Sequence, residues 1–168
     1  MTIQTGQPLP EGTLSESPDF DPASGCPLKP QPFSVPEQAK GKRVVIFGVP
    51  GAFTPTCSAQ HLPGYIAQRE ALSAQGVDEV WCMSVNDGFV MAAWGRERGA
   101  SGTGRRVADG SADYARKLGL EMDLTAKGMG MRCQRFALVA DDGVVTQVAV
   151  EEPGKFEVSN AEAVLARL

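Results

Sequence analysis

The stretch that decides the fold is an apolar run followed by a proline-containing turn, and it reads Val44-Val45-Ile46-Phe47-Gly48-Val49-Pro50-Gly51-Ala52-Phe53-Thr54-Pro55-Thr56-Cys57. Its first half is continuously apolar and rich in β-branched residues, which is typical of a strand buried on both faces. The residues that follow Cys57 are predicted to be helical to about Gln75, with a break or kink near Pro63-Gly64. A buried strand that leads directly into a helix indicates an α/β domain.

More strands and helices alternate along the rest of the chain. Strands are predicted at 80–85, 105–108, 136–140 and 144–150, and helices at 88–98, 111–118 and 161–168, with Asp87 and Ser159 as caps of the first and last helix. The turn Asp141-Asp142-Gly143 between two apolar runs is a strong hairpin signal. The sequence therefore predicts a central mixed β-sheet flanked by helices, with parallel crossovers and a late antiparallel hairpin.

The N-terminal part differs in composition from the rest. Eight of the twelve prolines fall between Pro8 and Pro36, so composition indicates a loop-rich, irregular stretch. A chain of 168 residues has the length of one ordinary domain. We therefore expect a single domain over residues 1–168, with residues 1–42 as its irregular N-terminal part.

Charge and hydropathy exclude two classes of partner. The formal net charge is −4, whereas binding to nucleic acid needs a basic surface. No stretch approaches the ~20 apolar residues that span a bilayer, and the first residues lack the basic and apolar pattern of a secretory leader. We expect a cytoplasmic protein that binds neither nucleic acid nor membranes.

The cysteines do not indicate a metal site. The chain has four, Cys26, Cys57, Cys82 and Cys133, with no CxxC pair, and His61 is its only histidine. Structural zinc sites need four ligands in short paired spacings. The glycine clusters at 99–104 and 128–130 also lack the spacing of a phosphate-binding loop. The sequence predicts neither a metal nor a cofactor.

Cys57 stands in a position that suits a nucleophile. Thr54 can cap the helix and Pro55 fits its first position, which places Cys57 in the first turn. Free backbone N–H groups and the positive end of the helix dipole there favour an anion, and the thiolate is the reactive form of cysteine. The alternative is a small residue packed under the turn, since buried cysteines are common.

These residues resemble the active-site segment of type II peroxiredoxins, the peroxiredoxin-five class. The pattern PxxxTxxC falls on Pro50, Thr54 and Cys57, and His61-Leu62-Pro63-Gly64 follows it. The likeness covers almost the whole chain and continues at residues 82–87, 89–95, 127–132 and 135–138. It implies a thioredoxin-like fold. Residues 6–14 resemble the family's opening hairpin, so the N-terminal part is expected to fold onto the domain.

The resemblance implies a thiol-dependent peroxidase that reduces hydrogen peroxide and organic hydroperoxides in antioxidant defence and redox homeostasis. Cys57 would be the peroxidatic cysteine, oxidised to a sulfenic acid. The implied companions are Thr54 and Pro50 beside it and Arg132 as the cation. The backbone N–H of Thr56 would be a further donor to the oxygen on which negative charge develops. The family also implies a homodimer, with Phe53 and the 89–94 helix as candidate contacts.

Three other residues have two interpretations each. His61 lies on the same helix face as Cys57 and could tune the thiolate, although a neutral, packed histidine is favoured because a cation is disfavoured near a helix N-terminus. Cys82 lies in an apolar strand and is interpreted as a core residue rather than a resolving thiol. Cys133 follows Arg132, and strand alternation turns it to the opposite face.

The reductant and two rival functions stay open. Some type II relatives carry a second reactive cysteine near the C-terminus, and residues 154–160 contain none. Glutathione with glutaredoxin is therefore expected to reduce the oxidised Cys57, with thioredoxin as the alternative. A disulfide oxidoreductase would usually have CxxC, and Gln60 occupies that position. A redox sensor would consume peroxide stoichiometrically rather than catalytically.

Overall fold

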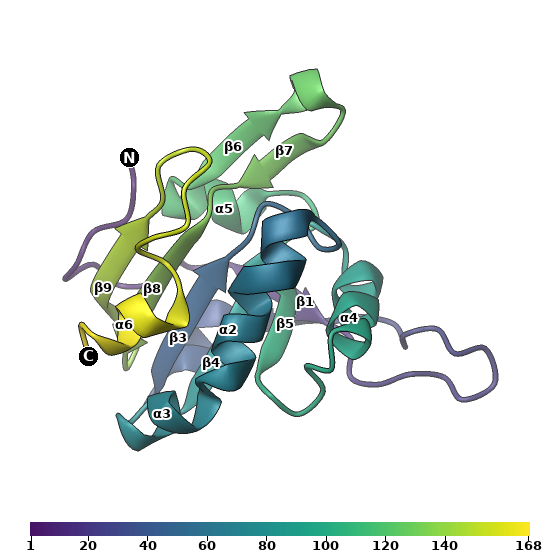
Figure 1. Ribbon diagram of the computed structural model, residues 1–168, viewed down its shortest axis with the longest axis horizontal. Helices are drawn as coiled ribbons and strands as arrows, with labels where there is room; N and C mark the ends of the chain where they lie inside the picture. Colours follow the sequence, from purple (N-terminus) through teal and green to yellow (C-terminus); the bar gives the residue numbers. More distant parts are fainter.

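The computed structural model describes residues 1–168 and contains a seven-stranded sheet in the order β2-β1-β5-β4-β3-β8-β9 (Figure 1). Its strands are β1 (Thr13–Glu16), β2 (Gln31–Ser34), β3 (Arg43–Gly48), β4 (Glu79–Ser84), β5 (Arg105–Ala108), β8 (Phe136–Asp141) and β9 (Val144–Val150). The pairs β3–β4 and β4–β5 are parallel, and all other neighbours are antiparallel. The predicted mixed sheet with a late hairpin is confirmed.

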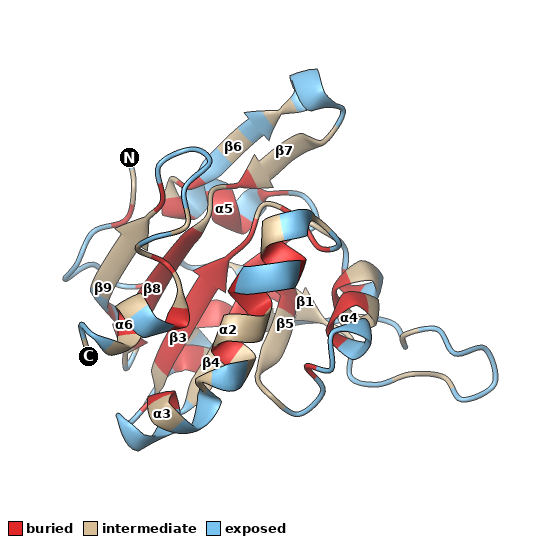
Figure 2. Cartoon of the chain, in the orientation of Figure 1, coloured by how far each residue is buried: buried red, intermediate tan, exposed pale blue.

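Helices cover both faces of this sheet. On one face lie α1 (Val35–Ala39) and α5 (Asp113–Leu118), and on the other α2 (Leu62–Ala67), α3 (Arg69–Ala74), α4 (Gly88–Glu97) and α6 (Ala161–Leu165). Because side chains alternate along a strand, β3 contributes Val44 and Ile46 to one core and Val45 and Phe47 to the other. Figure 2 shows β3 and β8 as the buried centre of the molecule.

Local signals explain where several elements begin and end. Asp87 caps α4, as predicted, by accepting from the N–H of Val90 at 2.9 Å. Asp142 and Gly143 both have positive φ, +48° and +79°, which is the backbone that a tight hairpin between β8 and β9 requires. The predicted cap of the last helix is wrong. Asn160 caps α6 by accepting from Ala163, because the Ser159 hydroxyl donates to Glu151 instead.

The N-terminal part is more regular than its composition indicated. β1 and β2 form an antiparallel hairpin at the edge of the sheet, later in the chain than the expected hairpin at residues 6–14. Residues 17–30 connect them as an arm that projects from the body (Figure 1). Arg96 of α4 holds this arm, with its guanidinium 3.9 Å from the centre of the Phe20 ring and a 2.9 Å hydrogen bond to the Gly25 carbonyl.

A second, small sheet was not predicted. β6 (Glu121–Leu124) and β7 (Gly130–Cys133) form an antiparallel ribbon closed by a 3-10 turn at Thr125–Lys127. Figure 1 shows this ribbon projecting from the main sheet next to α5. Of the glycines at 128–130, Gly128 lies in the loop that follows the 3-10 turn, whereas Gly130 already pairs with Leu124.

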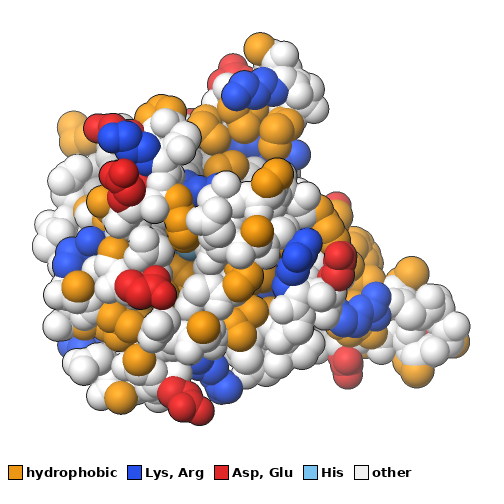
Figure 3. All heavy atoms as spheres, in the orientation of Figure 1, with side chains coloured by type: hydrophobic (Ala, Val, Ile, Leu, Met, Phe, Trp, Pro, Cys, Tyr) orange, Lys and Arg blue, Asp and Glu red, His pale blue; other side chains and the backbone are white.

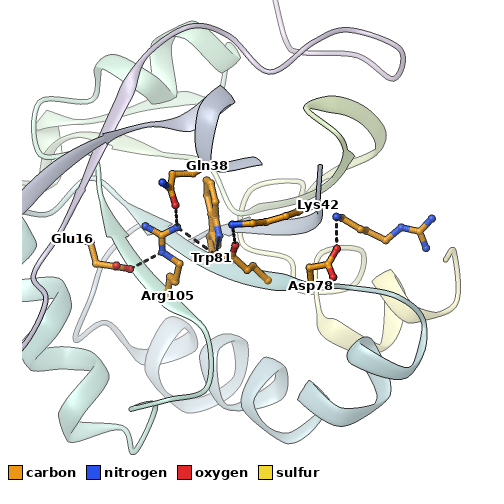
Figure 4. A network of polar contacts seen from close by, with 8 residues as sticks. Glu16, Gln38, Lys42, Asp78, Trp81 and Arg105 are labelled. Atoms are coloured by element: carbon orange, nitrogen blue, oxygen red, sulfur yellow. Dashed lines mark hydrogen bonds and ion pairs between the residues drawn. The ribbon is translucent and has the colours of Figure 1, made fainter. Parts of the chain in front are cut away.

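A polar network joins β1, α1, β4 and β5 on the α1 side of the sheet (Figure 4). Arg105 donates to Glu16 at 3.0 Å, to Gln38 at 3.1 Å and to Glu79 at 3.4 Å. Its guanidinium also lies over the rings of Phe33 and Trp81, at 4.4 and 5.0 Å from their centres. Lys42 forms a second ion pair with Glu79.

The surface agrees with the balanced composition. Figure 3 shows acidic and basic side chains interspersed over the face that it displays, without a continuous basic patch. Among the helices of the structure, none has the length and apolar character needed to cross a bilayer.

Candidate active site

Cys57 opens a π-helical turn, Cys57–His61, in which the N–H of Leu62 donates to the Cys57 carbonyl five residues earlier. Pro63 explains this wide turn, because its ring conflicts with the carbonyl four residues before it and it has no N–H to donate. The irregularity predicted at Pro63-Gly64 therefore lies one turn earlier. The chain leaves helical geometry only at Gln68, between α2 and α3.

The Cys57 side chain is fully buried, with 0% of its surface exposed, at the end of the core formed by α2, α4 and the sheet. Arg135 Nη2 donates to Cys57 Sγ at 3.2 Å. A guanidinium in hydrogen-bond contact stabilises negative charge that develops on the sulfur. This contact makes Cys57 the candidate nucleophile.

The expected cation, Arg132, makes different contacts. Its Nε donates to the Met129 carbonyl at 2.8 Å and its Nη1 to the Pro50 carbonyl at 3.3 Å. The prediction that Arg132 is the cation beside the thiol therefore needs correction to Arg135. The physical reason is topological: Arg132 belongs to the projecting ribbon, whereas Arg135 directly precedes Phe136, which pairs with Gly48 at the end of β3.

The other predicted residues belong to the turn that leads into Cys57. The Thr54 hydroxyl donates to the Gly51 carbonyl at 2.6 Å, so it is not a helix cap, and the Thr54 carbonyl accepts from the N–H of Ser58 at 3.0 Å. Pro50 and Thr56 are half-buried on either side of this turn. The predicted capping role of the Thr54 hydroxyl is therefore wrong.

His61 is fully buried and contacts Arg135 rather than the thiol. Its Nδ1 lies 3.0 Å from Arg135 Nη1 and its Nε2 lies 3.0 Å from the Ser159 carbonyl oxygen. Because a guanidinium only donates and a carbonyl only accepts, His61 must be neutral, with its proton on Nε2. Burial and the positive charge of Arg135 lower the pKa of His61 to about 3. His61 thus orients the guanidinium.

The other cysteines differ from Cys57 in their surroundings. Cys82 and Cys133 are buried, and the Cys133 thiol donates to the Val49 carbonyl at 3.2 Å. Burial raises the pKa of Cys133 to about 12 and that of Cys82 well above its ordinary value. Both are therefore neutral thiols, and buried neutral thiols are inert. Cys26 is exposed on the arm at residues 17–30.

Phe156 covers the outer side of this arrangement. Its ring meets the His61 ring edge-on at 4.9 Å between centres, and the Arg135 guanidinium carbon lies 5.7 Å from the centre of the Phe156 ring. On the inner side, Trp94 Nε1 donates to the Ser58 hydroxyl at 2.9 Å. No three His, Cys, Asp or Glu side chains converge in the way that metal ligands would.

Comparison with known proteins agrees with this site. The Redoxin family model matches residues 4–165. Peroxiredoxin-2B of Arabidopsis thaliana is 48% identical over 166 residues, which cover 99% of this chain and 98% of that protein. The chain belongs to the peroxiredoxin family. Peroxiredoxin-2C of Oryza sativa subsp. japonica is likewise 48% identical, with the same coverage of both chains.

Solved structures confirm the thioredoxin-like fold of this peroxiredoxin. The crystal structure of reduced Prx3 from Vibrio vulnificus in complex with H2O2 matches with a TM-score of 0.89 and 48% identity, over 99% of each chain. The resemblance to type II peroxiredoxins is confirmed by these relatives. These relatives support a thiol-dependent peroxidase activity for this chain.

Proposed function

We propose that this peroxiredoxin reduces hydrogen peroxide and organic hydroperoxides at Cys57 and that an external thiol then reduces the oxidised cysteine. Glutathione with glutaredoxin is the preferred reductant and thioredoxin the alternative. The observation that carries the proposal is the 3.2 Å hydrogen bond from Arg135 to a fully buried Cys57 Sγ.

The reaction follows from this contact. The Cys57 thiolate attacks one peroxide oxygen, the O–O bond breaks, and the electron pair passes to the other oxygen, which takes up a proton and leaves as water or alcohol. Cys57 becomes a sulfenic acid. The Arg135 guanidinium stabilises first the thiolate and then the charge that develops on the leaving oxygen. Thr54, Pro50 and the N–H of Thr56 are proposed to line the approach to Sγ.

The chemistry of the other cysteines favours an external reductant. Cys82 and Cys133 are buried and their raised pKa values keep them protonated, so neither is a good nucleophile toward the sulfenic acid. Because Cys57 itself is 0% exposed, the residues around Sγ must move to admit a peroxide, and a bulkier thiol needs a wider opening of the π-helical turn. We propose that oxidation precedes this opening.

Peroxide turnover and mass analysis test this proposal. Cys57→Ser should abolish catalytic peroxide consumption, whereas Cys82→Ser and Cys133→Ser should each keep most of their turnover with the glutaredoxin system. Intact-mass analysis after one equivalent of peroxide plus glutathione should show a glutathione adduct on Cys57. A dominant Cys57–Cys82 disulfide, with activity lost in Cys82→Ser, would contradict the mechanism. Stoichiometric peroxide loss with every thiol reductant would instead indicate a redox sensor.

We also propose a homodimer formed near the active-site loops. Phe53 and Phe89 are large apolar side chains that are 50% and 47% exposed, and a hydrogen bond from the Ala52 N–H to the Asn86 side chain joins the turn of Phe53 to the segment just before α4. Trp94, on the same helix as Phe89, is fully buried and is not a contact. Light scattering at high concentration should show a dimer that Phe89→Glu weakens. A wild-type protein that stays monomeric would contradict this assignment.

A further inference from the structure

The Glu151 carboxylate lies just after β9 and is buried, with 7% of the residue exposed. It accepts from the N–H groups of Glu157, Val158 and Ser159, each at 2.9 Å, and from the Ser159 hydroxyl at 2.7 Å. It forms no salt bridge. Burial opposes its charge, but these hydrogen bonds outweigh burial and lower the pKa of Glu151. Glu151 is therefore an ionised clamp on residues 157–159.

The clamped segment is joined to the reacting sulfur by a continuous series of hydrogen bonds. The Ser159 carbonyl accepts from Tyr65 Oη at 2.7 Å and from His61 Nε2 at 3.0 Å. His61 Nδ1 accepts from Arg135 Nη1 at 3.0 Å, and Arg135 Nη2 donates to Cys57 Sγ at 3.2 Å. Each group in the series has one orientation that satisfies both of its neighbours.

Glu151 also contacts Arg135 directly, through a backbone hydrogen bond. The N–H of Glu151 donates to the Arg135 carbonyl at 2.9 Å, next to the pairing of Val150 with Phe136. Glu151 thus fixes the Arg135 backbone directly and its guanidinium through Ser159 and His61. No carboxylate contacts Arg135 to orient it instead.

We propose that Glu151 is a positioning residue for peroxide reduction. Its carboxylate holds residues 157–159 so that the Ser159 carbonyl and His61 keep the Arg135 guanidinium on Cys57. The inference rests on the proposed function and extends it to a residue that touches neither peroxide nor Sγ. A misplacement of about 1 Å at a reacting centre costs on the order of 10²-fold in rate, so loss of the clamp should slow the reaction measurably.

A double-mutant cycle separates positioning from general structural support. The variants are Glu151→Ala and Glu151→Gln, each alone and with Arg135→Ala. Glu152→Ala is the matched control, because Glu152 is the exposed neighbour and pairs only with Lys155. The readout is the single-turnover rate of the reduced protein with hydrogen peroxide, followed by tryptophan fluorescence, since Trp94 contacts Ser58 beside Cys57.

Glu151→Ala should slow the reaction roughly 10- to 100-fold in the wild-type background and less than about 2-fold in the Arg135→Ala background. Glu151→Gln keeps one acceptor oxygen and should recover part of the rate. If Glu151→Ala does not fold, Glu151→Gln replaces it in the double-mutant cycle. Glu152→Ala should react like the wild type.

Two outcomes would overturn the positioning role while leaving the proposed function intact. One is an unchanged rate in Glu151→Ala, and the other is an equal slowing in both backgrounds, which would make the clamp a purely structural one. Wild type and Cys57→Ser are measured in the same series. A wild type that reacts no faster than Cys57→Ser would contradict the proposed function itself, and the positioning role with it.

Discussion

Arg105 and Arg135 each lie half-buried beside aromatic rings, yet their charges are used differently. Arg105 donates to the carboxylates of Glu16 and Glu79 within the network of Figure 4. Arg135 donates to a neutral imidazole and to a cysteine sulfur, and no carboxylate pairs with it. One guanidinium is neutralised by its neighbours, and the other is not.

The difference shows what makes an arginine available for chemistry. A guanidinium that is already paired with carboxylates attracts a further anion only weakly. The paired charge of Arg105 instead holds β1, α1, β4 and β5 together. An unpaired, half-buried charge is costly for stability. That cost is offset at Arg135 when the neighbouring sulfur or the leaving oxygen becomes negative.

Substitution by lysine should give the largest difference between the two arginines in the rate of peroxide reduction. In Arg135→Lys the charge stays, but an ammonium lacks the planar fork that reaches His61 Nδ1 and Cys57 Sγ together. We expect peroxide reduction to slow roughly 10- to 100-fold. Arg105→Lys should leave the rate unchanged. A stopped-flow comparison of the two variants checks this, and equal rates would remove the distinction between the two sites.

Removal of Arg105 should affect stability and not catalysis. Its side chain is only 21% exposed, and Arg105→Ala leaves Glu16 and Glu79 without this partner and uncovers the Phe33 and Trp81 rings. We expect a loss of about 2–4 kcal/mol in the free energy of unfolding. Urea titration measures it. A stable variant with a slower peroxide reaction would show that the edge network serves the active site.

The neutral state of His61 predicts a pH dependence of stability. Its pKa is about 3 in the folded protein, against an ordinary value of 6.5. Between these values the unfolded chain binds a proton that the folded protein does not, so stability falls as the pH drops below 6.5, by up to about 1.4 kcal/mol per pH unit.

His61→Gln removes the group that binds this proton in the unfolded chain, so it should remove the contribution of His61 to the pH dependence of stability. From pH 7 to pH 5 the wild type should therefore lose about 2 kcal/mol more than His61→Gln in urea titrations. The carboxylates that also titrate are common to both proteins and cancel. Equal losses would mean that His61 is charged, or exposed, in the folded protein.

Local patterns were enough for most of the fold. The apolar run of β3, the Asp87 cap of α4 and the turn at Asp142-Gly143 each depend on neighbouring residues alone. The ribbon of β6 and β7 was missed because its polar residues, such as Glu121 and Asp123, give no strong strand pattern. Its pairing becomes visible only when the two segments are brought together.

The site was predictable only in part. Thr54, Pro50 and Cys57 are close in sequence, so a short motif locates them. The cation is different, because Arg132 and Arg135 both precede Phe136 and the sequence does not say which one reaches Cys57. The register of β8 against β3 decides it, since Phe136 pairs with Gly48. The role of Glu151 was equally hidden in the sequence, because the pairing of β9 with β8 is what brings it next to Arg135.

The central claim is that the Arg135 guanidinium, and not that of Arg132, stabilises the charge that develops when Cys57 attacks a peroxide. Single-turnover rates of Arg135→Ala and Arg132→Ala, with hydrogen peroxide and with iodoacetamide, test it most directly. Iodoacetamide reacts with the thiolate but has no leaving oxygen. We predict that Arg135→Ala slows the peroxide reaction roughly 10²- to 10³-fold and alkylation by less, while Arg132→Ala stays close to the wild type with both reagents. A larger loss in Arg132→Ala than in Arg135→Ala would contradict the account.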